Sequence, residues 1–144
     1  MTYRKGVFIV CYRKSNDKIL YLLLKRKLHW KGWEFPKGGV EKKESIKKTV
    51  LRELKEETGQ TAKKIKKHDY KGKYKYQKKL EDRKEIGQTF SLYSVELKKE
   101  KIKIDEREHS NYSWLTFNKA IKKLTWPNQR KCLKIVNKVI NKSP

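Results

Sequence analysis

The chain has 144 residues, of which 39% are charged and 35% hydrophobic, and its formal net charge is +24. This length suits one domain with a single core, and the four Trp, eight Tyr and four Phe residues argue against intrinsic disorder. So basic a chain indicates a polyanionic partner such as nucleotide phosphates, RNA or another acidic surface, unless the lysines serve only solubility.

The cysteines and the N-terminus indicate where the protein works. The apolar run Val7–Tyr12 is too short for a signal peptide or a membrane span, so we expect a cytoplasmic protein without a membrane partner. Cys11 and Cys132 have no metal or redox spacing and are expected to be buried free thiols.

The first third of the chain predicts two buried strands. Both faces of Tyr3–Arg13 are apolar, as in a strand covered on two sides, and Ile19–Lys25 is similar. Residues 15–18, Ser-Asn-Asp-Lys, predict the turn between them. His29 follows the second strand and is either a phosphate ligand or a surface residue.

Residues 36–39, Pro-Lys-Gly-Gly, predict a tight loop after these strands. Proline fixes one dihedral angle, and paired glycines let the backbone approach a ligand closely. The carbonyl of Gly38 could therefore offer an oxygen ligand, although an ordinary turn explains the same residues.

The next segment predicts a helix over Ser45–Thr58, with Ser45 as its N-cap and Gly59 at its end. At about 100° per residue, one face of this helix is apolar and an adjoining stripe is acidic. The apolar face comprises Ile46, Val50, Leu51 and Leu54, and the acidic stripe comprises Glu53, Glu56 and Glu57.

Three neighbouring carboxylates repel each other, and a bound cation would relieve that repulsion. Mg²⁺ and Mn²⁺ prefer carboxylate and carbonyl oxygen and often bridge to substrate phosphate. A solvated acidic face neutralised by lysines is the alternative interpretation.

The segment Lys63–Tyr76 alternates tyrosine with lysine, which predicts a strand with one aromatic and one basic face. Either the aromatic side chains pack inward, or one of them stacks on a base while lysines neutralise phosphates. The candidates for substrate contact are Lys73, Tyr74, Lys75 and Tyr76.

The rest of the chain predicts a charged loop over Gln77–Lys84, a strand over Glu85–Leu97 and a polar connection over Lys98–Arg107. A short strand, Tyr112–Leu115, precedes two helices. Thr116 can cap a helix over Phe117–Leu124, and Pro127 opens the last one. The last helix has an apolar stripe of Cys132, Ile135, Val136, Val139 and Ile140. Since no repeat or linker intervenes, residues 1–144 are expected to form one domain.

The spacing of a few residues between positions 38 and 59 is more specific than any single element. In order, these residues are Gly38, Glu44, Arg52-Glu53-Leu54, Glu56-Glu57 and Gly59. This spacing resembles the Nudix box of the Nudix hydrolases, which cleave nucleoside diphosphates linked to another moiety. Gln60 departs from the apolar residue that usually follows the last glycine, which leaves the packing of the helix exit open.

The resemblance extends over most of Val7–Ile140, although only the box is diagnostic. Trp33–Gly39, Ile86–Gln88 and Glu108 look like two Nudix groups, the asymmetrical diadenosine tetraphosphate hydrolases and the bacterial RNA 5′-pyrophosphohydrolases. Lys37 favours the first group, because the RNA group usually has glutamine there.

The resemblance implies an α+β fold in which a mixed β-sheet is sandwiched between α-helices. It implies that Mg²⁺, or Mn²⁺ in its place, is held by Gly38, Glu53, Glu56, Glu57 and Glu108. Either Glu53 or Glu108 would be the general base, and Arg52 would orient Glu53. Lys37, together with Lys73 or Lys75, would neutralise the polyphosphate.

The reaction we expect is hydrolysis of a bis(5′-nucleosyl) tetraphosphate, such as diadenosine tetraphosphate, to ATP and AMP. The alternatives are pyrophosphate removal from RNA 5′ ends, hydrolysis of nucleoside triphosphates, and a non-catalytic RNA-binding module that kept the fold.

Overall fold

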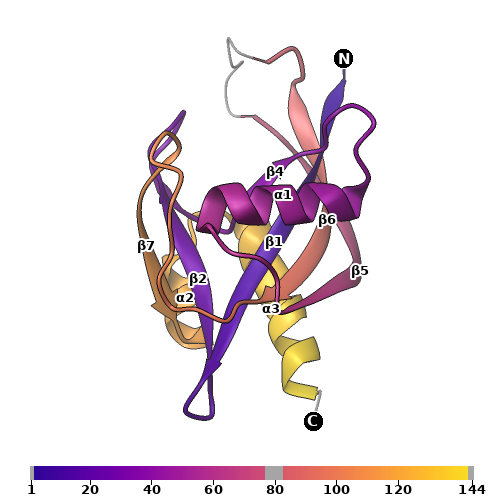
Figure 1. Cartoon of the computed structure of the whole chain (residues 1–144). Coiled ribbons are helices and arrows are strands. Elements are labelled where there is room, and N and C mark those ends of the chain that lie inside the picture. Colours follow the sequence, from indigo (N-terminus) through magenta and orange to yellow (C-terminus); the bar gives the residue numbers. More distant parts are fainter. Residues whose placement is uncertain (1, 77–82, 143–144) are drawn as a thin grey trace.

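A computed structural model describes residues 2–76 and 83–142 and shows a mixed sheet with helices on both faces (Figure 1). The strands follow the order β3-β2-β1-β6-β5, with β4 paired to β1 and β7 paired to β2. The strands are β1 (Tyr3–Ser15), β2 (Lys18–Arg26), β3 (Gly32–Glu34), β4 (Lys37–Gly39), β5 (Lys64–Lys75), β6 (Gly87–Glu96) and β7 (His109–Leu115). The helices are α1 (Ile46–Thr58), α2 (Phe117–Lys123) and α3 (Pro127–Lys142).

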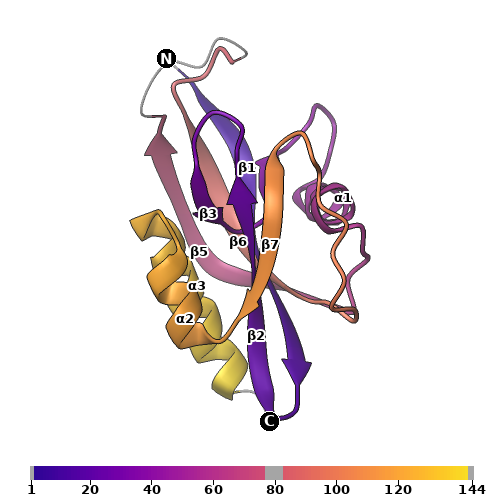
Figure 2. The same cartoon turned by 90° about the vertical axis from the view of Figure 1, so that its left-hand side faces the viewer.

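The sheet lies between α1 on one face and the α2–α3 pair on the other (Figure 2). Strands β1 and β6 run parallel, and the other pairs are antiparallel. The predicted α+β fold with a sheet between helices is therefore confirmed.

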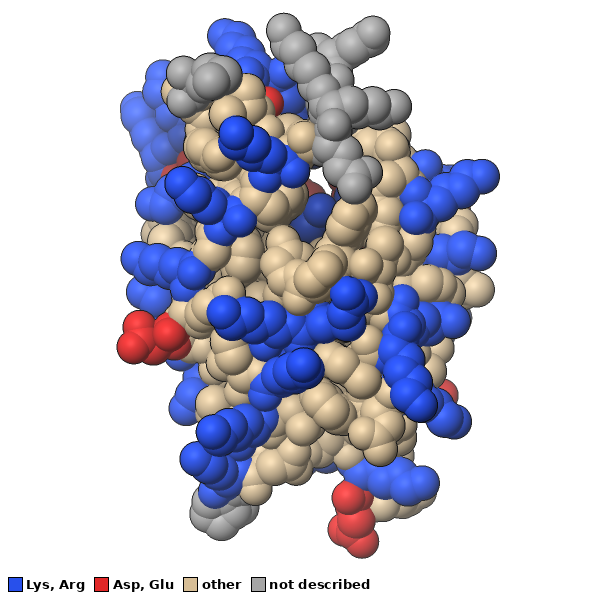
Figure 3. All heavy atoms as spheres, turned by 180° about the vertical axis from the view of Figure 1, so that it is seen from behind, with Lys and Arg blue, Asp and Glu red and all other residues tan. Residues whose placement is uncertain are grey.

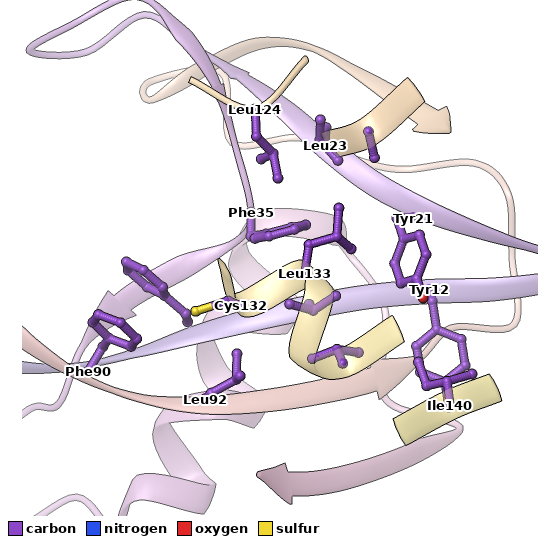
Figure 4. Packing of buried hydrophobic residues seen from close by; sticks show 14 residues of the cluster. Tyr12, Tyr21, Leu23, Phe35, Phe90, Leu92, Leu124, Cys132, Leu133 and Ile140 are labelled. Carbon is purple, nitrogen blue, oxygen red and sulfur yellow. The ribbon is translucent and has the colours of Figure 1, made fainter. Parts of the chain in front are cut away.

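Strand β1 supplies side chains to both cores, because both of its faces are apolar. Phe8 and Val10 point toward α3, whereas Val7 and Ile9 point toward α1. Each fully buried side chain of this kind contributes about 1.5–3 kcal/mol to folding. Figure 4 shows the cluster beneath α3, whose labelled members include Tyr21, Leu23, Phe35, Phe90, Leu92 and Leu133. Both cysteines are buried free thiols, as predicted.

Strand β4 replaces most of the loop that we expected at residues 36–39, and another short strand, β3, precedes it. Strand β3 pairs with the end of β2, and β4 pairs with β1 so that Gly38 lies beside Val7. Between them, the carbonyl of Pro36 accepts a hydrogen bond of 2.9 Å from the amide of Ile9. The loop is thus held as part of the sheet, which fixes it beneath α1.

Helix α1 begins and ends as predicted, but one of its apolar residues was assigned wrongly. The Ser45 hydroxyl accepts a hydrogen bond from the Lys48 amide, and Gly59 ends the helix in the left-handed conformation. Leu51 is 43% exposed and does not belong to the buried face. Leu51 lies at the edge of the apolar arc, on a side of the helix that no longer faces the sheet.

The departure from the box at Gln60 has a structural explanation. Its side chain is buried, and Nε2 donates hydrogen bonds to the carbonyls of Lys99 (2.8 Å) and Lys101 (3.1 Å). Oε1 accepts a hydrogen bond from the amide of Lys99. Gln60 therefore fastens the helix exit to the 98–103 connection through polar contacts.

Most of the predicted loop Gln77–Lys84 lies outside the described residues, which omit 77–82.

Among the described helices, none combines the length and apolar character that crossing a bilayer requires.

Candidate active site

Arg52 organises the acidic side of α1. Its guanidinium donates two hydrogen bonds to the Glu44 carboxylate (2.8 and 2.9 Å), one to the Gly39 carbonyl (2.9 Å) and one to Glu53 (2.7 Å). The hydrogen bonds from Arg52 and then from Thr49 lower the pKa of Glu44 to about 2. Arg52 therefore joins helix α1 to the loop before it and holds the Glu53 carboxylate by a charge-assisted hydrogen bond.

Gly38 lies directly against the Glu53 carboxylate. A Cβ atom at position 38 would overlap the Glu53 side chain, so any residue larger than glycine must displace one of the two. Burial raises the pKa of Glu53 to about 7, even though the hydrogen bond from Arg52 opposes that rise. The backbone of β4 and the first carboxylate of the acidic stripe are thus in contact.

One buried carboxylate, that of Glu34, contacts three basic side chains. Glu34 is fully buried and accepts hydrogen bonds from Arg26 (3.2 Å) and from Nε2 of His109 (2.8 Å). The Lys37 ammonium lies 3.3 Å from its other oxygen. Burial alone would raise the pKa of Glu34, but Lys37, His109 and Arg26 outweigh it and lower that pKa to about 2.

Glu57 has no comparable set of partners. It is 1% exposed, and Oε2 lies 3.1 Å from Nδ1 of His109. In the described part of the chain, neither oxygen of Glu57 nor this ring nitrogen has a hydrogen bond of good geometry. Burial raises the pKa of the Glu57 carboxyl, although the histidine opposes the rise. Glu57 therefore has an ion-pair contact with His109 but, among the described residues, no hydrogen bond of good geometry to its oxygens.

The surroundings of Glu57 fit a divalent cation. Ligand atoms of Glu57, Glu108 and His109 lie within 4.8 Å of one another. A cation beside them would give the Glu57 oxygens the partner that they lack, and hard cations favour carboxylate oxygen. Glu57 and Glu108 belong to the predicted ligand set, whereas His109 does not.

The remaining predicted ligands, together with Glu108 of this cluster, line a cavity of about 200 Å³. Glu53 and Glu56 come from α1, Glu108 comes from the residue before β7, and Gly38 comes from β4. The same cavity has basic walls, to which the predicted residue Lys37 belongs. Sequence reasoning missed the four arginines of these walls, Arg4, Arg26, Arg83 and Arg107.

A larger cavity, of about 710 Å³, lies beside the first and has aromatic walls. The rings of Trp30 and Trp126 meet edge to face with centroids 5.2 Å apart. Tyr74 and Tyr76 form another part of the lining. All six residues that we predicted as substrate contacts line this cavity, namely His29, Lys37, Lys73, Tyr74, Lys75 and Tyr76.

Lys37 lies where the two cavities meet. It lines both of them, as do Arg26 and Arg83. Its ammonium is 5.8 Å from the ring centroid of Trp30 and 5.5 Å from that of Tyr74, which are cation–π distances. A molecule with an aromatic group in the large cavity and phosphates in the small one would contact Lys37 midway.

A family model covers most of this chain. A model described as the NUDIX domain matches residues 2–134. The chain belongs to the Nudix family. Curated relatives include the RNA pyrophosphohydrolases of Zymomonas mobilis and Hydrogenovibrio crunogenus, each 39% identical over 59 and 57 residues. The aligned stretches are 41% and 40% of this chain but only 37% and 32% of those proteins.

Solved Nudix structures share the fold of this chain. A Caenorhabditis elegans Ap4A hydrolase binary complex gives a TM-score of 0.74 at 24% identity, covering 96% of this chain and 98% of that one. The NUDIX domain of Shewanella oneidensis NrtR, complexed with ADP ribose, gives a TM-score of 0.78 at 16% identity. The match covers 97% of this chain and 90% of that one. At these identities the similarity establishes the fold alone.

We predict that replacing Glu34 with Gln destabilises the protein by about 3–5 kcal/mol at pH 7, because the buried Arg26 and His109 and the partly buried Lys37 lose their counter-charge. The pKa of Glu34 is lowered in the folded state to about 2. Its stabilising effect is therefore complete above pH 5 and is lost as the pH falls toward 2. Urea unfolding across this range should show a flatter pH dependence for Glu34→Gln than for the wild type.

The matched control is Asp17→Asn in the exposed β1–β2 turn, where the positive φ suits asparagine. It should unfold like the wild type at every pH. An unchanged pH dependence in Glu34→Gln would contradict the proposed role of Glu34.

We also predict that Gly38→Ala weakens Mn²⁺ binding by roughly tenfold or more, because the new methyl group displaces the Glu53 carboxylate. Electron paramagnetic resonance of free Mn²⁺ measures this affinity without turnover. Ser110→Ala, at an exposed position of β7, is the control and should bind Mn²⁺ normally. Wild-type affinity in Gly38→Ala would show that Glu53 is not a ligand.

Proposed function

We propose that this chain hydrolyses a phosphoanhydride bond of a nucleotide polyphosphate with the help of Mg²⁺, for which Mn²⁺ can substitute. The observation that carries this proposal is the junction at Lys37. There, a small cavity with carboxylate and basic walls opens beside a large cavity with aromatic walls. Phosphates and a nucleobase need these two environments side by side.

The small cavity would hold the reacting phosphates. Glu53, Glu56, Glu57, Glu108 and the Gly38 carbonyl would hold the cation, which supplies a Lewis acid and lowers the pKa of a bound water. Glu53 and Glu108 both line the cavity and either of them would accept the proton of that water. Arg52 keeps Glu53 in one orientation through their 2.7 Å contact.

The basic side chains would position the rest of the polyphosphate. Arg26 and Lys37 line both cavities, and the Glu34 carboxylate between them fixes both side chains. Charge-assisted contacts from such fixed groups bind phosphate oxygens with defined geometry. They therefore orient the scissile phosphate relative to Glu53.

The large cavity would bind a nucleoside. Stacking of a base on an aromatic side chain contributes about 1–3 kcal/mol, and every base has a face that can stack. Trp30, Trp126 and Tyr76 offer such faces. Because stacking discriminates bases weakly, we expect phosphate chain length to matter more than base identity.

Dinucleoside tetraphosphates are the substrates that we favour. Lys37 is the residue typical of that Nudix group, and a cavity of about 710 Å³ is ample for a nucleoside. Triphosphorylated RNA 5′ ends are the second candidate, supported by the curated relatives named RNA pyrophosphohydrolase and by the net charge of +24.

We predict that Glu56→Gln lowers turnover on the order of 10³-fold, because it removes a proposed ligand of the activating cation. Glu56 is half-exposed, and within residues 2–76 and 83–142 its salt bridge is to Arg52, so the fold should be unaffected. Release of AMP from diadenosine tetraphosphate measures turnover, and thermal unfolding by circular dichroism measures the fold. Glu106→Gln, an exposed carboxylate outside the cavity, is the control. Near-normal turnover in Glu56→Gln would exclude Glu56 from the metal site.

The substrate class is tested with a panel of diadenosine tetraphosphate, triphosphorylated RNA and nucleoside triphosphates, each with Mg²⁺. We expect ATP and AMP from the first compound, since water attacks one end of the tetraphosphate. Pyrophosphate from RNA as the dominant product would favour the second candidate. If no compound is cleaved while RNA binds without Mg²⁺, the chain is a non-catalytic RNA-binding module.

A further inference from the structure

The solvent-exposed side of α3 carries one lysine per helical turn. Lys131, Lys134, Lys138 and Lys142 are exposed, and their spacing of three or four residues places them on one side. The opposite side of α3, which includes Leu133 and Val136, is buried in the core. We call these four residues the lysine stripe.

The lysine stripe belongs to a region without acidic side chains. From His109 to Lys142 the chain has eight Lys and Arg residues and no Asp or Glu. Figure 3 shows the face covered by α2 and α3, where Lys and Arg side chains are many and acidic ones few. In the described part of the chain, no salt bridge joins the stripe to a carboxylate. On the α1 side, by contrast, Arg52 is surrounded by glutamates.

This arrangement is unfavourable for the isolated helix. Lysines four residues apart, such as Lys134 and Lys138, repel each other. The first turn of α3 has no acidic residue to complement the helix dipole. Lys131 lies near that end, where a positive charge is disfavoured, and its ammonium sits 5.2 Å from the Tyr70 ring centroid. A bound polyanion would relieve all of these costs.

The position of the lysine stripe indicates which polyanion it suits. Helix α3 starts at the large cavity, because Pro127, Asn128 and Gln129 line that cavity. The stripe leads away from this point with one positive charge per rise of about 5.4 Å. An anionic membrane is a poor partner, since the apolar side of α3 is buried and cannot insert.

We propose that the lysine stripe binds the phosphate backbone of a single-stranded RNA whose 5′ nucleotide occupies the large cavity. This inference rests on the proposed function in its RNA form. The chain would leave the cavity over the first turn of α3 and follow the four lysines toward the C-terminal end of the helix. The stripe thereby adds affinity for long substrates without contacting the reacting phosphates.

The test compares two variants with the same loss of charge. The stripe variant is Lys131→Gln, Lys134→Gln and Lys138→Gln, and glutamine has a similar helix propensity to lysine. The control is Lys98→Gln, Lys99→Gln and Lys101→Gln in the exposed connection next to the exit of α1. Thermal unfolding by circular dichroism verifies that both variants are folded.

Binding is measured by fluorescence anisotropy with a single-stranded oligoribonucleotide long enough to reach Lys142, in EDTA so that no turnover occurs. The stripe variant should lose about tenfold or more in affinity, and its salt slope should fall by about 2 because three phosphate contacts disappear. The control should change the affinity about twofold at most. Neither variant should change the KM for a mononucleotide substrate or any kcat.

Each other outcome overturns the proposal. Equal losses in both variants would mean that diffuse charge attracts the RNA. Unchanged binding in the stripe variant would mean that the stripe has no part in it. Reduced binding to phosphatidylserine vesicles with unchanged RNA binding would indicate a membrane surface. Because binding is measured without turnover, a chain that cleaves nothing would contradict the proposed function separately.

Discussion

The site depends on a single buried carboxylate, that of Glu34. Four strand ends meet around it, because Arg26 ends β2, Glu34 ends β3, Lys37 begins β4 and His109 begins β7. Burying any one of these charges alone costs several kcal/mol, so they are stable only as an assembled group. Two members of this group, Lys37 and Arg26, line both cavities. Fold and site therefore share this network.

The loop carrying Gly38 is held from several sides at once. Strand β1 pairs with β4, Arg52 bonds to the Gly39 carbonyl, and Glu34 contacts the Lys37 ammonium. These restraints come from the sheet, from α1 and from the buried network, respectively. Because all of them act within three residues, the backbone can be placed against the Glu53 carboxylate without a side chain between them. Preorganisation of this kind is what a metal site requires of its scaffold.

Local sequence signals predicted the helix α1, its caps and the acidic stripe, because spacing within one helix fixes which side chains share a face. They could not predict the pairing of His109 with Glu34, two residues that are 75 positions apart. Each of them taken alone is an ordinary residue at a strand end, and only the pairing of β7 with β2 and of β3 with β2 brings them together. The arginines of the basic walls were missed for the same reason, since Arg4 lies on β1, far in the sequence from the Glu53 that lines the same cavity. Leu51 was assigned wrongly for a local reason: its angular position on the helix does not show where the buried face ends.

The small cavity combines charges of both signs, and this has a chemical consequence. Its walls include Glu53, Glu56, Asp105 and Glu108 as well as Arg4, Arg26, Lys37, Arg83 and Arg107. A polyphosphate entering alone would meet the carboxylates and be repelled by them, while the arginines would attract it. A divalent cation held by the carboxylates would convert that repulsion into attraction. Binding of the cation and binding of the polyphosphate would then strengthen each other by the same factor. The lysine stripe lies outside this balance, because its charges are not offset by acids and attract a polyanion whether or not the cation is present.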